Sequence, residues 1–290
     1  MSVANDDTYE LSDLVETWRP GPVAVEDSII AEPARRLGAT LDLDDAFVDG
    51  AALPLLWHWL YFPSWPATSQ LGPDGHPTDG HFMPPMPQRR RMFAGGRLEI
   101  KAPMVIGERT QRLSELASAV VKHGRSGEML FVTIRQTFRQ GGTVVLEEER
   151  DLVYRSESER SSAFARASAG ATAPPAAWHH TPHIDATVLF RFSALTSNAH
   201  RIHYDQRYAG AEEGFPDLVV HGPLLAIYMA NLVHASEHER IPASFDFRLR
   251  RPVFLGDRVT VQGTPVAGGA ELAVVSGQDT IHASATVTYR

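Results

Sequence analysis

Three histidines gather in the second half of the chain, next to the start of an apolar segment. His200 and His203 are three residues apart, and His221 comes directly before Gly222. An imidazole has an unperturbed pKa of about 6.5, so it can take up or release a proton near neutral pH. Packing alone explains poorly why polar rings stand beside an apolar helix start. The pattern therefore favours acid–base chemistry at His203.

The apolar segment beside these histidines has the features of a helix start. Gly222 and Pro223 precede the run LLAIYMANLV, and proline is favoured near the first helical position. The first N–H groups of a helix have no partner within it and lie at the positive end of its dipole. They can stabilise a negative oxygen that develops during a reaction, and we expect Gly222 to do so. His221 could face a substrate or brace the loop, and both roles stay open.

The segments that must position these groups have the sequence pattern of short β-strands. Alternating runs at 130–139 and 143–155 flank Gly141-Gly142, which predicts a hairpin. Near the C-terminal end the same pattern predicts three more strands, at 259–265, 271–276 and 280–289.

A weak internal repeat links the two halves. PMVIGER at 103–109 matches PVFLGDR at 252–258, and each half later reaches a Tyr-Arg pair. Each half also has an apolar helix candidate before the motif, which in the first half is LLWHWLYF at 55–62. A helix that is apolar on all faces must be enclosed, and a curved antiparallel sheet can enclose it. We therefore predict an α+β fold, a double hot-dog in which two antiparallel sheets each wrap around a long apolar helix.

Composition sets the domain boundaries and excludes several functions. Residues 156–180, rich in Ser, Ala and Pro, predict a linker between an N-terminal domain at 1–155 and a C-terminal domain at 181–290. Zero cysteines exclude disulfides and thiolate sites. A net charge of -8 disfavours nucleic acid as a partner. No apolar run approaches the ~20 residues of a membrane helix, and the start of the sequence is acidic, so we expect a cytoplasmic protein without a membrane partner.

The histidine segment resembles the motif of the MaoC-like (R)-specific enoyl-CoA hydratases. In that motif Asp, then Asn-Pro, then an apolar residue and His precede a downstream His-Gly. Here SNAHRIH at 197–203 and the pair His221-Gly222 take these places. The chain is more similar still to the double hot-dog branch with mesaconyl-C4-CoA hydratases, itaconyl-CoA hydratases and mitochondrial-type 3-hydroxyacyl thioester dehydratases. Signatures that resemble the first domain of that branch stand at 56–59, 74–77, 91–96 and 122–127.

The resemblance implies reversible hydration of a 2-enoyl thioester, such as mesaconyl-C4-CoA or itaconyl-CoA. Coenzyme A would be part of the substrate, and no metal or redox cofactor would be needed. Asn198 stands where the family has a catalytic Asp. We therefore infer that His203 is the general base and acid, and that Asn198 holds water or substrate by hydrogen bonds. His200 and Arg201 could add polar contacts.

Positive residues are candidates for binding the anionic parts of such a substrate. Arg91 and Arg250 belong to clusters that could hold the phosphates of coenzyme A, because guanidinium groups suit phosphate geometry. If the acyl group carries a carboxylate, Arg201 or Arg91 could pair with it. The spacing of His200 and His203 would also suit a metal pair, but no acidic third ligand is evident nearby, so we predict no metal.

The first domain has a different expected role. The loop at 37–53, which corresponds to the histidine loop, has acids but no histidine. We therefore expect the first domain to shape the acyl pocket, with the long loop at 68–87 near its entrance. A homodimer stays open. Other readings also stay open: a 3-hydroxyacyl-ACP dehydratase, an acyl-CoA thioesterase, or a non-catalytic thioester-binding protein, which Asn198 would favour.

Overall fold

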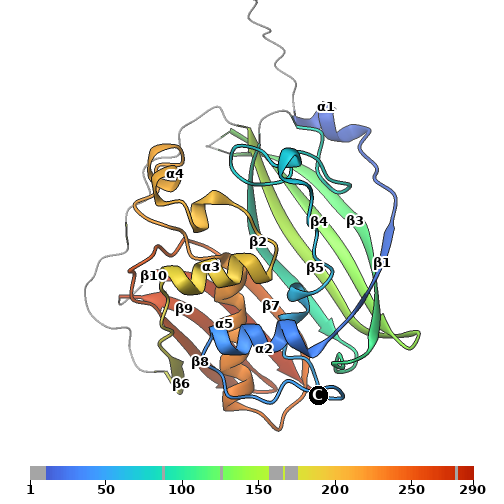
Figure 1. The fold of residues 1–290 in the computed structure, drawn as a ribbon, viewed down its shortest axis with the longest axis vertical. Coiled ribbons are helices and arrows are strands. Elements are labelled where there is room, and N and C mark those ends of the chain that lie inside the picture. The colour runs from blue at the N-terminus through green and yellow to red at the C-terminus, as the bar shows by residue number, and fades with distance from the viewer. Residues whose placement is uncertain (1–10, 87–88, 125–126, 157–165, 167–175, 278–279) are drawn as a thin grey trace, which may run out of the picture.

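The computed structural model describes residues 11–86, 89–124, 127–156, 166, 176–277 and 280–290. Within them, ten strands form one sheet in the order β1-β3-β4-β5-β2-β7-β10-β9-β8-β6 (Figure 1). Strand pairing is antiparallel throughout this part of the chain. The strands are β1 (Val23–Ser28), β2 (Arg89–Ile100), β3 (Arg109–Gly124), β4 (Gly127–Gln140), β5 (Thr143–Ser156), β6 (Trp178–His180), β7 (Pro242–Leu249), β8 (Thr260–Val266), β9 (Gly269–Ser276) and β10 (Thr280–Tyr289).

The sheet consists of two halves that meet edge to edge. Strands of the first half stay together, strands of the second half stay together, and β2 pairs with β7 at the junction. The hairpin predicted around Gly141-Gly142 is β4 and β5, and the three predicted C-terminal strands are β8, β9 and β10. The two sheets of the predicted double hot-dog are thus joined into one continuous sheet.

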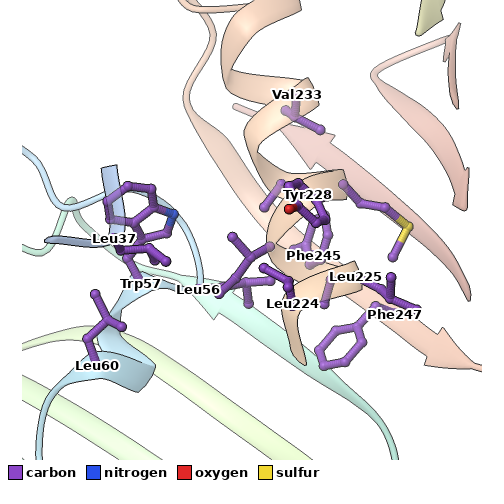
Figure 2. Close-up of a cluster of buried hydrophobic side chains, with 14 of the residues drawn as sticks. Leu37, Leu56, Trp57, Leu60, Leu224, Leu225, Tyr228, Val233, Phe245 and Phe247 are labelled. Carbon is purple, nitrogen blue, oxygen red and sulfur yellow. The ribbon is translucent and has the colours of Figure 1, made fainter. Parts of the chain in front are cut away.

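The predicted central helix of the second half is α5 (Gly222–Ser236). It packs against β8, β9 and β10 and is apolar on nearly every face. Its side chains share one buried core with residues of the first half. Figure 2 shows Leu224 and Leu225 of α5 in the same cluster as Leu56 and Trp57.

The first half lacks the long helix that was expected at 55–62. Only a single 3₁₀ turn, η1 (Trp57–Leu60), forms there. Leu56 and Phe62 take positive φ angles of 70° and 58°, which interrupt a helical path on both sides. Side chains in η1 also reach out to separate buried partners: Trp57 donates a hydrogen bond to Asn231 of α5, and His58 bonds Glu148. The expectation of a long apolar helix in each half is therefore wrong for the first half.

The repeated motif has the same structural role in both halves. Gly107 and Gly256 both take positive φ, 97° and 88°, in the turn before a strand. In each half a single β-bridge joins the motif to the segment before the helix position. These bridges are Ala52 with Val105 and Val219 with Phe254. The internal repeat inferred from sequence is therefore visible in the fold.

The remaining described elements are short. Most of the predicted linker at 156–180 lies outside the described residues, and its last three residues form β6, which pairs with β8. Residues 125 and 126 of the 122–127 signature also lie outside them. No helix among the described residues is long and apolar enough to span a bilayer. The other helices are α1 (Leu11–Glu16), α2 (Ala31–Thr40), η2 (Thr68–Gln70), α3 (Ala186–Leu195), η3 (Arg201–His203) and α4 (Gln206–Ala211).

Candidate active site

His203 is held at the end of η3 against the segment that leads into α5. Its Nδ1–H donates a 2.7 Å hydrogen bond to the carbonyl of Val219. The N–H of Val219 in turn donates to the carbonyl of Ile202, which ties the two segments together. Because a carbonyl can only accept, Nδ1 carries the proton and Nε2 is left as the basic nitrogen. The side chain is buried, with 7% of the residue exposed.

His221 completes a stacked pair of imidazoles. The rings of His203 and His221 lie 3.7 Å apart between centroids and are nearly parallel. Nε2 of His221 is 2.8 Å from the hydroxyl of Ser193, whereas its buried Nδ1 has no hydrogen-bond partner. Burial lowers the pKa of His203 to about 4 and that of His221 well below its usual value. Both rings are therefore neutral at pH 7.

The start of α5 lies beside this pair. His221 is the residue before Gly222, so the ring that stacks on it lies next to the helix N-terminus. The next residue, Pro223, has no N–H, which leaves Gly222 as the first donor of the helix. A Cβ at Gly222 would lie 2.4 Å from Cδ1 of Leu249, so glycine allows β7 to pack against this turn.

Asn198 shapes the loop between α3 and η3. Its side-chain oxygen accepts the N–H of His200 at 3.1 Å, and its own N–H donates to the carbonyl of Ser193. The amide oxygen expected to hold water is thus used within the loop. The ring of His200 lies 5.6 Å from that of His203 and perpendicular to it. Burial is the main reason that the pKa of His200 falls to about 2.

Two residues of the first half reach the histidines, and sequence reasoning missed both as site residues. Asp74 accepts the Nδ1–H of His76 at 2.9 Å, and the His76 ring lies 4.0 Å from the ring of His200. The expectation that no acidic group stands near His200 is therefore wrong. Asp74 and His76 were noted only as part of the signature at 74–77, and nothing local in that pattern says which loop it meets.

These three residues are of types that bind metals. Asp74, His76 and His200 bring one ligand atom each to within 4.8 Å of one another. Both oxygens of Asp74 already accept bonds from His76, one from its backbone N–H and one from its ring. In this structure the three residues form a hydrogen-bonded Asp–His pair that lies against a second imidazole.

The candidate arginines differ in what they contact. Arg201 donates to Asp205 and lies over the ring of Tyr208. Arg250 follows the end of β7 and donates to the hydroxyl of Ser284. The charge of Arg91, on β2, helps to lower the pKa of His200.

Comparison with known proteins identifies the family. The family model described as hydroxyacyl-thioester dehydratase type 2 matches residues 56–255, well over half of the chain. The chain belongs to this family. The mesaconyl-C(4)-CoA hydratase of Chloroflexus aurantiacus is 44% identical over 241 residues, which cover 82% of this chain and 84% of the relative. Members of this dehydratase family are hydro-lyases, and the protein is one that acts on an enoyl or 3-hydroxyacyl thioester. The predicted enzyme class is confirmed.

Solved structures show the same fold at low sequence identity. A MaoC-like dehydratase superposes with a TM-score of 0.70 at 14% identity, covering 95% of this chain and 99% of that one. A Mycobacterium tuberculosis protein described as having a double hotdog fold gives a TM-score of 0.58 at 12% identity, with 95% and 97% covered. The predicted double hot-dog fold is confirmed.

Proposed function

We propose that this dehydratase-family protein hydrates a 2-enoyl-CoA, with His203 as general base and acid. The observation that carries the proposal is the geometry of this imidazole. Its Nδ1–H is fixed by Val219, its Nε2 is basic, and it stacks on the residue that precedes α5. A base and a helix N-terminus side by side are what addition of water to an enoyl thioester requires.

The reaction balances with these two groups. Nε2 of neutral His203 takes a proton from water as the water oxygen forms its bond to C3. The π electrons of the C2–C3 bond move toward the thioester oxygen, which the N–H of Gly222 stabilises. The imidazolium then returns its proton to C2, so that one water is added and the base is regenerated. Dehydration is the reverse. The step uses this chain's own groups, with coenzyme A as part of the substrate.

We propose a substrate whose acyl group carries its own carboxylate, as mesaconyl-C4-CoA and itaconyl-CoA do. The relative that is 44% identical is named for the first of these. Arg91 supports the proposal because it lies on β2 and its positive charge contributes to the lowered pKa of His200. An Arg91→Gln variant should raise KM for mesaconyl-C4-CoA and itaconyl-CoA about 10-fold or more, and should leave KM for crotonyl-CoA nearly unchanged. An equal rise for all three esters would contradict this role.

We also propose the division of labour expected from sequence. Residues 1–155 shape the acyl pocket, and residues 181–290 carry the acid–base histidine. Trp57 supports this division, since its indole N–H donates to Asn231 on α5 at 3.1 Å and brings the first half against the helix. Packing of Leu56 and Trp57 in the core shared with α5 agrees with it (Figure 2).

His203→Asn tests the proposal most directly. An Asn amide can still donate to Val219 in place of Nδ1, but it offers no base in place of Nε2. We expect kcat for hydration, followed by loss of enoyl absorbance, to fall about 100- to 10,000-fold with little change in thermal unfolding.

His234→Gln, an exposed histidine on the same helix α5, is the matched control and should keep full activity. Hydration that survives His203→Asn unchanged would overturn the assignment and favour a non-catalytic binding protein. Release of free thiol without hydration would indicate a thioesterase instead.

A further inference from the structure

Among the described residues of the second half, no carboxylate is bonded to His203. The side chain of Asn198 in the histidine loop is an amide, and its oxygen is already bonded to the N–H of His200. An amide cannot take up a proton at neutral pH. When His203 accepts a proton from water, a positive charge therefore forms on a buried ring whose immediate neighbours, His200 and His221, are neutral imidazoles.

A turn of the first half docks directly on this loop. The N–H of Arg201 donates to the carbonyl of Asp74 at 2.8 Å, and its guanidinium donates to the carbonyl of Pro73. A Cβ at Gly75 would lie 1.9 Å from the carbonyl oxygen of Ala199, and this glycine has a φ of 87°. Only glycine fits so close a backbone approach at that angle. The position of the first-half turn relative to the histidine loop is therefore fixed by backbone contacts.

Within this turn, Asp74 fixes the ring of His76. One carboxylate oxygen accepts the backbone N–H of His76 and the other accepts its Nδ1–H, each at 2.9 Å. Partial burial opposes ionisation of Asp74, but the hydrogen bonds from His76 outweigh it and lower its pKa to about 2. Asp74 is therefore negatively charged at neutral pH.

The Asp74–His76 pair lies at one end of a row of histidines. His76 lies 4.0 Å from His200, which lies 5.6 Å from His203. The negative charge of Asp74 raises the pKa of His200, whereas a positive charge on His76 lowers the pKa of both His200 and His203, so the carboxylate is the member of the pair that favours a nearby imidazolium. The other charged or titratable groups that face the cluster are Arg91 on β2, His221 before α5, Arg201 on η3 and Tyr208 on α4.

We propose that Asp74 and His76 are positioning residues of the active site, supplied by the first half in place of the carboxylate that position 198 lacks. Asp74 holds His76, His76 holds the ring of His200 against the reacting His203, and the carboxylate offsets the positive charge that forms on His203. This inference rests on the proposed function. It gives the first half a direct part in proton transfer in addition to shaping the pocket.

Asp74→Asn is the first test, since it keeps the shape of the side chain and removes its charge. We expect kcat for crotonyl-CoA hydration to fall about 100-fold while KM stays within about 3-fold. The acid limb of the kcat/KM profile should also move to lower pH, because loss of the negative charge makes imidazolium formation on the histidines harder. Asp79→Asn is the matched control: it is an exposed aspartate of the same loop that caps its own turn, and it should behave as wild type.

His76→Asn keeps the proposal testable if the first variant folds poorly. Its amide can replace the ring donor to Asp74 but not the contact with His200. It should show the same fall in kcat, with a circular dichroism spectrum like that of wild type.

Three results would overturn the inference. Wild-type kcat and pH profile in folded Asp74→Asn, with His203→Asn inactive, would remove Asp74 from the mechanism and leave the proposed function standing. A reduced kcat with an unmoved acid limb in both variants would assign the pair a merely structural role. Loss of wild-type activity with a chelator, restored by a divalent cation, would make Asp74 a metal ligand instead.

If both His203→Asn and Asp74→Asn kept full activity, the proposed function itself would fail.

Discussion

Each half of the molecule buries a histidine near the position of its helix, and the two differ in their partners. In the first half, Nε2–H of His58 donates to Glu148 at 3.0 Å. The other oxygen of Glu148 accepts from Trp59 at 2.7 Å, and Arg150 lies 3.0 Å from the carboxylate. In the described part of the second half, no carboxylate is bonded to Nε2 of His203, and the ring stacks on another neutral imidazole.

The comparison shows that burial alone does not make a histidine reactive. Burial lowers the pKa of His58 as it does that of His203, so both rings are neutral at pH 7. Nε2 of His58 carries a proton that is committed to Glu148, so this nitrogen is a donor. Nε2 of His203 stays an acceptor because Val219 takes the proton of Nδ1. The first histidine is therefore tied to a buried carboxylate, whereas the second keeps the free acceptor nitrogen that the proposed general base requires.

The largest effect on stability is expected where the buried charge is paired. Burial opposes ionisation of Glu148, but Arg150 and His58 outweigh it and lower its pKa to about 2. Glu148→Gln would leave Arg150 without its counter-charge and should cost about 3 to 5 kcal/mol in the free energy of unfolding, measured with urea. Glu147→Gln, on the same strand but with 41% of its side chain exposed, should change it by less than about 1 kcal/mol. Equal losses would mean that Glu148 is not the central charge of the first-half core.

His203 and Glu148 should lose their contributions to the free energy of unfolding over different pH ranges as acid is added. The pKa of His203 is about 4 in the folded protein, below the unfolded value near 6.5, so the unfolded chain binds more protons between these values. The contribution of neutral His203 to the free energy of unfolding is therefore lost as pH falls from about 6.5 toward 4. This loss is roughly 3 kcal/mol at most.

The contribution of ionised Glu148 to the free energy of unfolding is fully present above the pKa that this carboxyl has in the unfolded chain. It is lost only as pH falls from about 4.5 toward 2. Urea unfolding at pH 7, 5.5 and 4.5 would separate the two ranges. The loss between pH 7 and 4.5 should be smaller in His203→Asn than in wild type. An identical loss in both proteins would contradict the assignment of this range to His203.

The smallest effect concerns two buried Ser–His pairs of the second half. Ser193→Ala removes the hydroxyl at Nε2 of His221, and Ser276→Ala does the same at Nε2 of His282. Each should lower the free energy of unfolding, measured by thermal denaturation, by about 1 to 2 kcal/mol, because a buried polar nitrogen loses its hydrogen-bond partner. Only Ser193→Ala should lower hydration, by several-fold, since His221 stacks on His203, the proposed general base. A similar activity loss in Ser276→Ala would show that the effect is not local.

Local patterns predicted much of this molecule. Gly222-Pro223 before an apolar run placed the start of α5, and glycine pairs between alternating runs placed the strands of both halves. The histidine loop was recognised from its spacing to His221-Gly222 together with its resemblance to the hydratase motif. These signals work because helix starts, turns and strand faces depend on residues that are neighbours in the chain. The same reasoning failed at 55–62, where apolar content predicted a helix and partners elsewhere in the fold produced one 3₁₀ turn.

The sequence by itself determined which residue types could do the chemistry, and where the helix that supports them begins. Only the tertiary structure decided which groups share the site. Asp74 and His76 meet His200 because a first-half turn docks on the histidine loop through Gly75, and Ser193 meets His221 because α3 packs beside the start of α5. The physical reason is that contacts between distant segments depend on how the whole chain packs, and no short stretch of sequence encodes the partner that it will meet.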